Sequence, residues 1–187
     1  LYNLPKTLPG IAVVHVENKA NGEAADYRIG LGCAPVSTDF RTETNVPEGW
    51  HVLNASAGKL SFGKDGSVIK TEAGSFAAEQ TPKNVLLQSA FGDWVGQTEL
   101  TFAPEADGQQ AGLVVYEDTN NSLRLTLEKA GSATVIRAYR LSGDKEAQLS
   151  SANVAISGAV KLQIVKKGNQ FTFKYCTDGS AWNQMKT

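Results

Sequence analysis

The chain has 187 residues, 41% of them hydrophobic and 20% charged, which is enough apolar content for one sizeable core. Its 18 Lys and Arg residues nearly balance its 19 Asp and Glu residues and form no basic cluster, which argues against nucleic acid as a partner. The longest apolar runs are far shorter than the roughly 20 residues that cross a bilayer, so we expect no membrane insertion.

Residues 1–37 are predicted to form an N-terminal β-hairpin extension, or the edge of a neighbouring domain. A β-branched run over 11–17 ends before Asn21-Gly22, which supplies the positive-φ residues of a tight turn. A second strand is predicted over 25–31. A connection containing Pro and Ser follows, and we place the domain boundary near 36–38.

Residues 38–187 are predicted to form the main domain, with the rhythm of an all-β protein. Stretches of strand composition recur about every 8 to 15 residues between turn signals, whereas helical periodicity is nearly absent. This rhythm indicates a sandwich or a barrel. The segment from Gly49 to Leu53 opens this domain. Further strands are predicted over 59–62, 67–71, 84–89, 96–102, 112–117, 123–129, 133–141, 160–166 and 170–175.

Two of these strands show which side faces the core. Leu123, Leu125 and Leu127 alternate with the polar residues of the predicted strand 123–129. An aromatic series alternates with polar residues over 170–175 in the same way. Because successive side chains of a strand point to opposite faces, one face of each strand is predicted to be core and the other wet or ligand-facing.

Aromatic rings are the main candidates for ligand binding, because flat rings stack on the apolar faces of pyranose sugars. Trp94 lies between two glycines in a predicted loop, which makes it the best candidate for an exposed platform. Trp50 and Trp182 have strand or post-turn contexts and are predicted to be core residues. The full set of predicted ligand-binding residues is Trp94, Tyr116, Asn120, Asn121 and Tyr139.

The segment 117–121 is also a candidate calcium loop, because it places several oxygen donors close together. The spacing of an EF-hand is absent, and a turn whose Asn side chains bond to their own backbone is the favoured alternative. Asp39 is a further candidate ligand on equally slight grounds. The predicted metal ligands are therefore Asp39, Glu117 and Asp118, with calcium left open as a cofactor.

Catalytic motifs were sought in the sequence and none is complete. His15 and His51 are interpreted as surface or structural histidines, because no Gly-x-Ser-x-Gly nucleophile motif accompanies them. The Glu-x-Asp-x-x-Glu string of jelly-roll glucanases is also missing. Cys33 and Cys176 lie in no metal-binding or redox motif, and whether they form a disulfide stays open.

Several segments resemble, in content and order, the concanavalin A-like domain that lies C-terminal to family 43 β-xylosidases and arabinofuranosidases. They are Asn84 to Gln88, Thr98 to Phe102, Gln110 to Tyr116, and Asn120 to Leu125. The tail Phe173-Lys-Tyr-Cys-Thr-Asp-Gly-Ser-Ala-Trp182 is similar to a hairpin common in that superfamily, with Cys176 where Ser is usual. The resemblance implies a two-sheet antiparallel concanavalin A-like or jelly-roll sandwich that packs on a propeller catalytic domain and has no catalytic residues of its own.

Three functions remain open at this point. The first is a noncatalytic carbohydrate-associated module, which binds a polysaccharide or glycan or braces a catalytic domain of the same protein. The second is a structural or protein-interaction spacer of a cell-surface protein. The third is a glycoside hydrolase or lyase with dispersed catalytic residues. The chain starts at Leu1 rather than Met, which suggests a processed product or an excised piece, and we expect an extracellular or cell-surface location.

Overall fold

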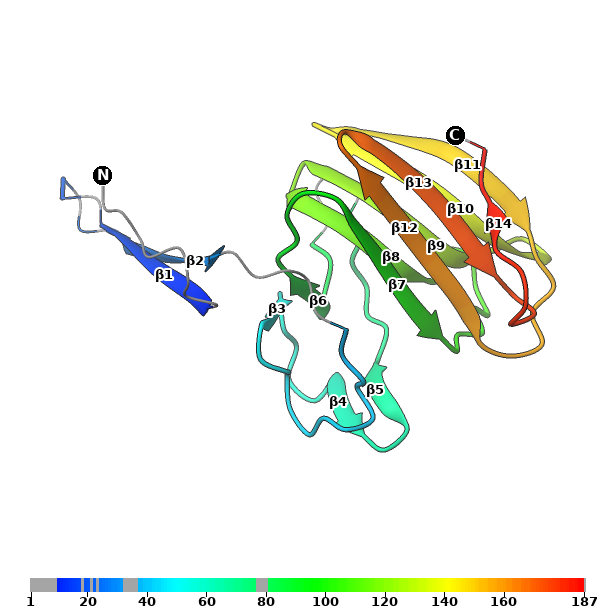
Figure 1. The fold of residues 1–187 in the computed structure, drawn as a ribbon, viewed down its shortest axis with the longest axis horizontal. Helices are drawn as coiled ribbons and strands as arrows, with labels where there is room; N and C mark the ends of the chain where they lie inside the picture. The colour runs from blue at the N-terminus through cyan, green and yellow to red at the C-terminus, as the bar shows by residue number, and fades with distance from the viewer. Residues whose placement is uncertain are drawn as a thin grey trace. The chain divides into compact units, whose positions relative to one another are not determined.

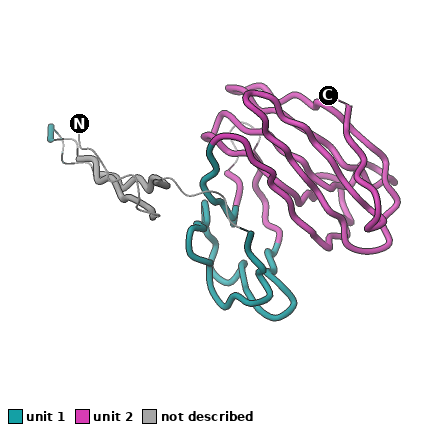
Figure 2. The backbone as a smooth tube through the Cα atoms, in the orientation of Figure 1, with its two compact units in different colours: residues 1–70, 84–91 teal, residues 71–83, 92–187 magenta. Residues whose placement is uncertain are grey.

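The structure is a computed structural model that describes residues 10–17, 19–20, 22, 24–31, 37–76 and 81–186. In these residues it contains strands and turns and no helix, so no described helix is able to cross a membrane. The chain divides into two compact units, one of residues 1–70 and 84–91 and one of residues 71–83 and 92–187 (Figure 2). Each unit is described by itself.

The first unit contains three two-stranded antiparallel pairs among the described residues. β1 (Gly10–Glu17) pairs with β2 (Ala24–Leu31), which confirms the predicted hairpin. β3 (Trp50–Leu53) pairs with β6 (Val85–Gln88), and β4 (Leu60–Gly63) pairs with β5 (Gly66–Ile69). The predicted domain boundary lies next to residues 32–36, which include Cys33 and are outside the described residues, so the boundary and the disulfide remain untested.

The second unit is a sandwich of two four-stranded antiparallel sheets in the part of the chain that is described (Figure 1). One sheet is a meander in the order β11-β10-β9-β8. The other has the order β14-β13-β12-β7, so the chain crosses from the first sheet to the second after β11. The strands are β7 (Trp94–Leu100), β8 (Gln110–Asp118), β9 (Asn121–Ala130), β10 (Ala133–Ser142), β11 (Lys145–Asn153), β12 (Val160–Lys167), β13 (Gln170–Cys176) and β14 (Asn183–Gln184).

The core lies between these two sheets. It is formed by the inward residues that the alternation predicts, with Leu125 and Leu127 of β9 facing Leu162 and Ile164 of β12, all almost fully buried. Burial of large aliphatic side chains supplies the main stabilising free energy of such a sandwich. The all-β, two-sheet antiparallel architecture predicted from the sequence is therefore confirmed.

Close packing of the first sheet depends on Gly112 of β8. A Cβ atom at this position would clash with the backbone carbonyl oxygen of Leu125 on the neighbouring strand. A larger residue would push β8 away from β9, where Gly112 is paired with Thr126. The glycine thus has a packing role that the strand pattern alone does not reveal.

Two strands of the sandwich were not predicted from the sequence, the two-residue β14 and the longer β11. β11 has the sequence KEAQLSSAN, which lacks both the β-branched residues and the clean alternation of a typical strand. It pairs with β10 as an edge strand, and the pairing contains a bulge next to Tyr139. Hairpin pairing with a strong neighbour therefore outweighs the weak strand propensity of this segment.

Candidate functional site

The most unusual feature of the sandwich is the side of the β8 to β11 sheet that faces away from the core, here called the outer face. Strand register places alternate residues of β9 on it, opposite partners from β8 and β10. Polar residues on such a face are normally wet. Here the polar residues of β9 are 3–7% exposed, namely Ser122, Arg124, Thr126 and Glu128.

Arg124 is at the centre of the outer face. Its guanidinium lies 5.7 Å from the ring centre of Phe76 and 4.9 Å from that of Tyr139, so it makes cation–π contacts with two aromatic rings. Nη1 donates to Gln110 Oε1 at 3.1 Å, and Nη2 forms an ion pair with Glu146. A charge buried in this way is tolerated because it is both paired and hydrogen-bonded.

Glu128 collects a second group of contacts on the same face. It accepts hydrogen bonds from Thr126 Oγ1 and from the Tyr139 hydroxyl, both at 3.1 Å. Arg137 Nη1 lies 3.5 Å from Glu128 Oε2 and donates to the Tyr139 hydroxyl at 3.4 Å. Burial raises the pKa of Tyr139, and the hydrogen bond to Tyr139 raises the pKa of Arg137, so both side chains keep their protons at neutral pH.

Two of the predicted ligand-binding residues come together here. Tyr139 belongs to the network, and the Tyr116 ring lies 6.1 Å from the Phe76 ring that covers Arg124. Asn120 and Asn121 lie nearby in sequence, in the turn that joins β8 to β9. The structure thus groups Tyr116 and Tyr139 around one polar centre.

The prediction that Trp94 is an exposed ring in a loop is wrong. It is the first residue of β7 rather than part of a loop, and it is half-buried against the core at 6.1 Å from the ring of Phe171. Gly96 leaves room for the indole, since a Cβ there would be 3.3 Å from the Trp94 ring. Strand pairing with Lys166 turns the ring inward, so it is not an exposed platform.

The other two tryptophans also differ in part from expectation. Trp182 is 39% exposed, so the core interpretation is wrong for it. Trp50 is half-buried in the first unit, where its ring lies 5.2 Å from Phe40 and its Nε1 donates to Thr38 Oγ1 at 2.9 Å. A polar partner at the indole nitrogen explains how this ring is accommodated.

The predicted metal ligands form no metal site with one another in the structure. Arg41 binds both carboxylate oxygens of Asp39 at 2.8 Å and lowers the pKa of that carboxyl to about 2. In the β8–β9 turn, Asp118 accepts hydrogen bonds from Asn121 Nδ2 at 3.0 Å and from the Asn120 amide at 2.7 Å, which lower its pKa. Glu117 is exposed beside it.

The β8–β9 turn is held by its own side chains, although the group that binds the backbone is the Asp118 carboxylate rather than an Asn side chain, as had been expected. Across the described ranges, no group of three or more His, Cys, Asp or Glu side chains is arranged to hold a metal ion. The calcium prediction gains no support from these contacts.

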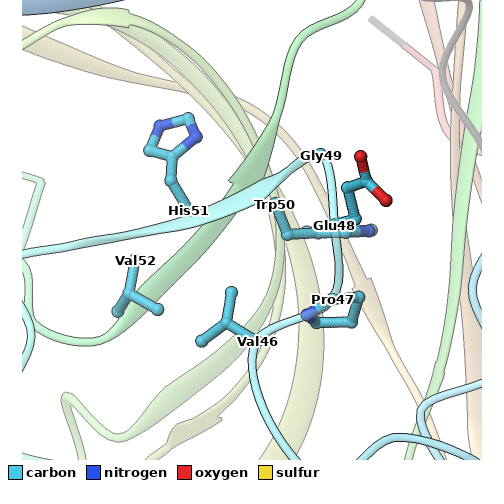
Figure 3. A pocket seen from close by; sticks show the side chains of 7 residues that line it. All are labelled: Val46, Pro47, Glu48, Gly49, Trp50, His51 and Val52. Atoms are coloured by element: carbon cyan, nitrogen blue, oxygen red, sulfur yellow. The ribbon is translucent and has the colours of Figure 1, made fainter. Parts of the chain in front are cut away.

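A hollow in the first unit is lined by residues 46–52 (Figure 3). His51 is exposed, and in this view it points to the opposite side of the strand from Val52. None of the predicted site residues lines the hollow. His15 lies on β1, and its side chain is outside the described residues. The outer face therefore remains the better candidate site.

Comparison with known proteins identifies the family. The profile of the "Beta xylosidase C-terminal Concanavalin A-like domain" matches residues 36–187, most of the chain. The chain belongs to this family. The match bears out the concanavalin A-like sandwich that the sequence segments implied, and no curated protein matches the chain.

Solved structures similar to this β-xylosidase C-terminal domain are family 43 (GH43) proteins. The GH43 protein BlXynB from Bacillus licheniformis has a TM-score of 0.69 at 18% identity over 91% of this chain and 36% of its own. GH43B of a Bacteroides ovatus xyloglucan PUL has a TM-score of 0.69 at 16% identity, over 92% of this chain and 37% of its own. A GH43_12 protein from a capybara gut metagenome has a TM-score of 0.67 at 18% identity, over 89% of this chain and 30% of its own. The chain spans about a third of the length of these neighbours, and the likeness shows the fold.

Sequence reasoning missed much of the network on the outer face of this domain. Phe76, Gln110 and Arg137 were not predicted as site residues, and Arg124 and Glu128 were placed only by alternation. A usable signal was present, because charged residues of both signs alternate with leucines in one central strand. Which segment covers them depends on the tertiary fold.

Proposed function

We propose that the chain is a noncatalytic accessory module that braces the catalytic domain of a family 43 glycoside hydrolase, in a protein that acts outside the cell or on its surface. The observation that carries the proposal is the match of residues 36–187 to a domain defined as the C-terminal part of β-xylosidases. The match covers 36% and 37% of the length of two family 43 neighbours, which agrees with a module that works beside a catalytic part.

Three carboxyl groups of the described residues are poorly suited to act as the general acid of a glycosidase. A glycosidase needs one carboxylic acid whose pKa is raised, so that it can protonate the leaving group. Hydrogen bonds from nearby donors lower the pKa of each of three carboxyl groups, Asp39, Asp118 and Asp178. Such carboxylates are stabilised in the charged form and are poor general acids.

The test measures the full chain alone and together with a family 43 catalytic domain from the same organism. We expect no release of nitrophenol from 4-nitrophenyl β-xyloside or α-arabinofuranoside by the chain alone. We expect the Tm of the catalytic domain to rise by several degrees when the chain is added, because a partner that binds only the folded state stabilises it. Serum albumin at the same concentration is the control.

Turnover by the chain alone, rising in proportion to its concentration, would reinstate the hydrolase alternative. A Tm that stays the same with the chain and with albumin would contradict bracing and favour the spacer alternative.

A further inference from the structure

The outer face of the β8 to β11 sheet has hydrogen-bonding capacity that the described residues leave unused. Ser122 Oγ, Arg124 Nε and Arg137 Nε are buried atoms without a partner among them. Ser122 and Arg124 are 7% and 3% exposed, so bulk water has little access to either side chain. Buried polar atoms are nearly always satisfied in folded proteins, and a cluster of exceptions on one face needs an explanation.

The groups around these atoms are of the kind that recognise sugars. Two tyrosine rings, a hydroxyl, a carboxylate, an amide and two guanidinium groups lie on one face of one sheet. Aromatic faces suit the apolar side of a pyranose ring, and the polar groups suit its hydroxyls.

The charges on this face favour a neutral ligand. Arg124 is paired with Glu146, and Arg137 with Glu128, so each cation already has an anionic partner. An anionic sugar would have to compete with these carboxylates for the guanidinium groups. A hydroxyl oxygen can instead accept from a free N–H without separating either pair.

The side chain that covers Arg124 is on a segment without regular structure. Phe76 follows residues 71–75, which form no strand, and its ring contacts that of Tyr116 and the guanidinium of Arg124. A Cβ atom at Gly74, whose φ is 149°, would clash with the carbonyl oxygen of Thr81, so the backbone passes close to itself at these two residues. The Phe76 ring is therefore held by its contacts with Tyr116 and Arg124 rather than by the backbone hydrogen bonds of a strand.

We propose that the outer face of the β8 to β11 sheet is a binding site for a neutral pyranose ring, and that Phe76 occupies the place of that ring in this structure. The sugar stacks on the Tyr116 ring, which Phe76 leaves, and accepts hydrogen bonds from Arg124 Nε and Arg137 Nε. Ser122 Oγ bonds a sugar hydroxyl. The site goes beyond the bracing role and does not depend on it.

The test is isothermal titration of the full chain with xylotetraose, cellotetraose and tetragalacturonate. Because a site closed most of the time binds with reduced apparent affinity, we expect Phe76→Ala to bind a neutral tetrasaccharide at least 10-fold more tightly than wild type. Adding Ser122→Ala to this variant should remove several-fold of the gain, since it deletes a ligand contact. Phe91→Ala is the matched control, because Phe91 is a phenylalanine exposed by 58% in the first unit.

A second readout avoids any dependence on the folding of Phe76→Ala. The Nε–H signals of Arg124 and Arg137 in an NMR spectrum of the wild-type chain should shift as xylotetraose or cellotetraose is added. Phe76→Leu, which keeps an apolar side chain, should show the same shifts at lower sugar concentration.

Three results would overturn the proposal: Nε–H signals that neither neutral sugar moves in wild type or in Phe76→Leu, a gain that Phe91→Ala reproduces, or a preference for tetragalacturonate. None of them bears on the bracing of a catalytic domain, which is measured separately.

Discussion

The two sheets of the sandwich share one core and differ on their other sides. On the outside of the β7, β12 and β13 sheet, Gln163 bonds Gln97 at 3.0 Å and Lys161 lies 3.5 Å from Glu99, and both contacts are in reach of water. On the outer face of the β8 to β11 sheet, the equivalent positions carry buried Arg124 and Glu128. One polar face is wet and the other is closed.

This difference shows that a row of polar residues on one side of a strand can be either exposed to water or buried. Both sheets have the same alternation and the same antiparallel pairing. At Arg124 the difference includes a covering residue from elsewhere in the chain, since Phe76 lies over its guanidinium. Ion pairs on the wet face are worth little, because water screens them, whereas those on the closed face gain strength at the cost of desolvation.

The largest expected effect is on the free energy of unfolding, from a substitution in the core that the two sheets share. Leu127→Ala should lower the free energy of unfolding by about 2–5 kcal/mol, because it leaves a cavity at a fully buried position. Urea unfolding followed by fluorescence measures this. Val95→Ala, at a position 58% exposed on the wet face, should change it by less than about 0.5 kcal/mol. Similar values for both variants would mean that the core does not lie between the sheets.

The outer sides of the two sheets can be compared directly by making the same Glu→Gln substitution once on each. Glu128→Gln should cost about 1–3 kcal/mol of unfolding free energy, because it removes a buried charge that Arg137 and Tyr139 contact. Glu99→Gln removes an exposed ion pair with Lys161 and should cost about 0–1 kcal/mol. Denaturant curves at two salt concentrations provide the measurement. If the two costs proved equal, the distinction between a closed and a wet face would fail.

The smallest effect concerns an exposed turn next to the wet sheet. Asp178 Oδ1 accepts from the backbone N–H groups of Ser180 at 2.9 Å and Ala181 at 3.3 Å, and these bonds hold its pKa at about 2. Because the folded-state pKa lies below the unfolded value, the stabilisation is complete above about pH 4 and is lost as the pH falls toward 2. The Tm difference between wild type and Asp178→Asn should shrink over that interval. A difference independent of pH would contradict the role of these hydrogen bonds.

The candidate site was only partly predictable for a physical reason. Tyr116 and Tyr139 were selected as rings, and the structure groups them around Arg124. Trp94 was selected on the glycines around it, but strand pairing turns it toward Phe171. Local composition indicates whether a ring can stack, whereas its exposure depends on which strand it joins.

The sequence by itself determined the all-β class, most strands and the core side of β9, because side-chain alternation is a local property of each strand. Its segments also sufficed to indicate the family that residues 36–187 match. Only the tertiary structure decided that β11 pairs with β10, that Trp94 faces inward, and that Phe76 closes over Arg124. The positions of Trp94 and Phe76 depend on contacts between residues far apart in the chain, which no local pattern encodes. β11 lacks a strand pattern of its own and is a strand because β10 pairs with it.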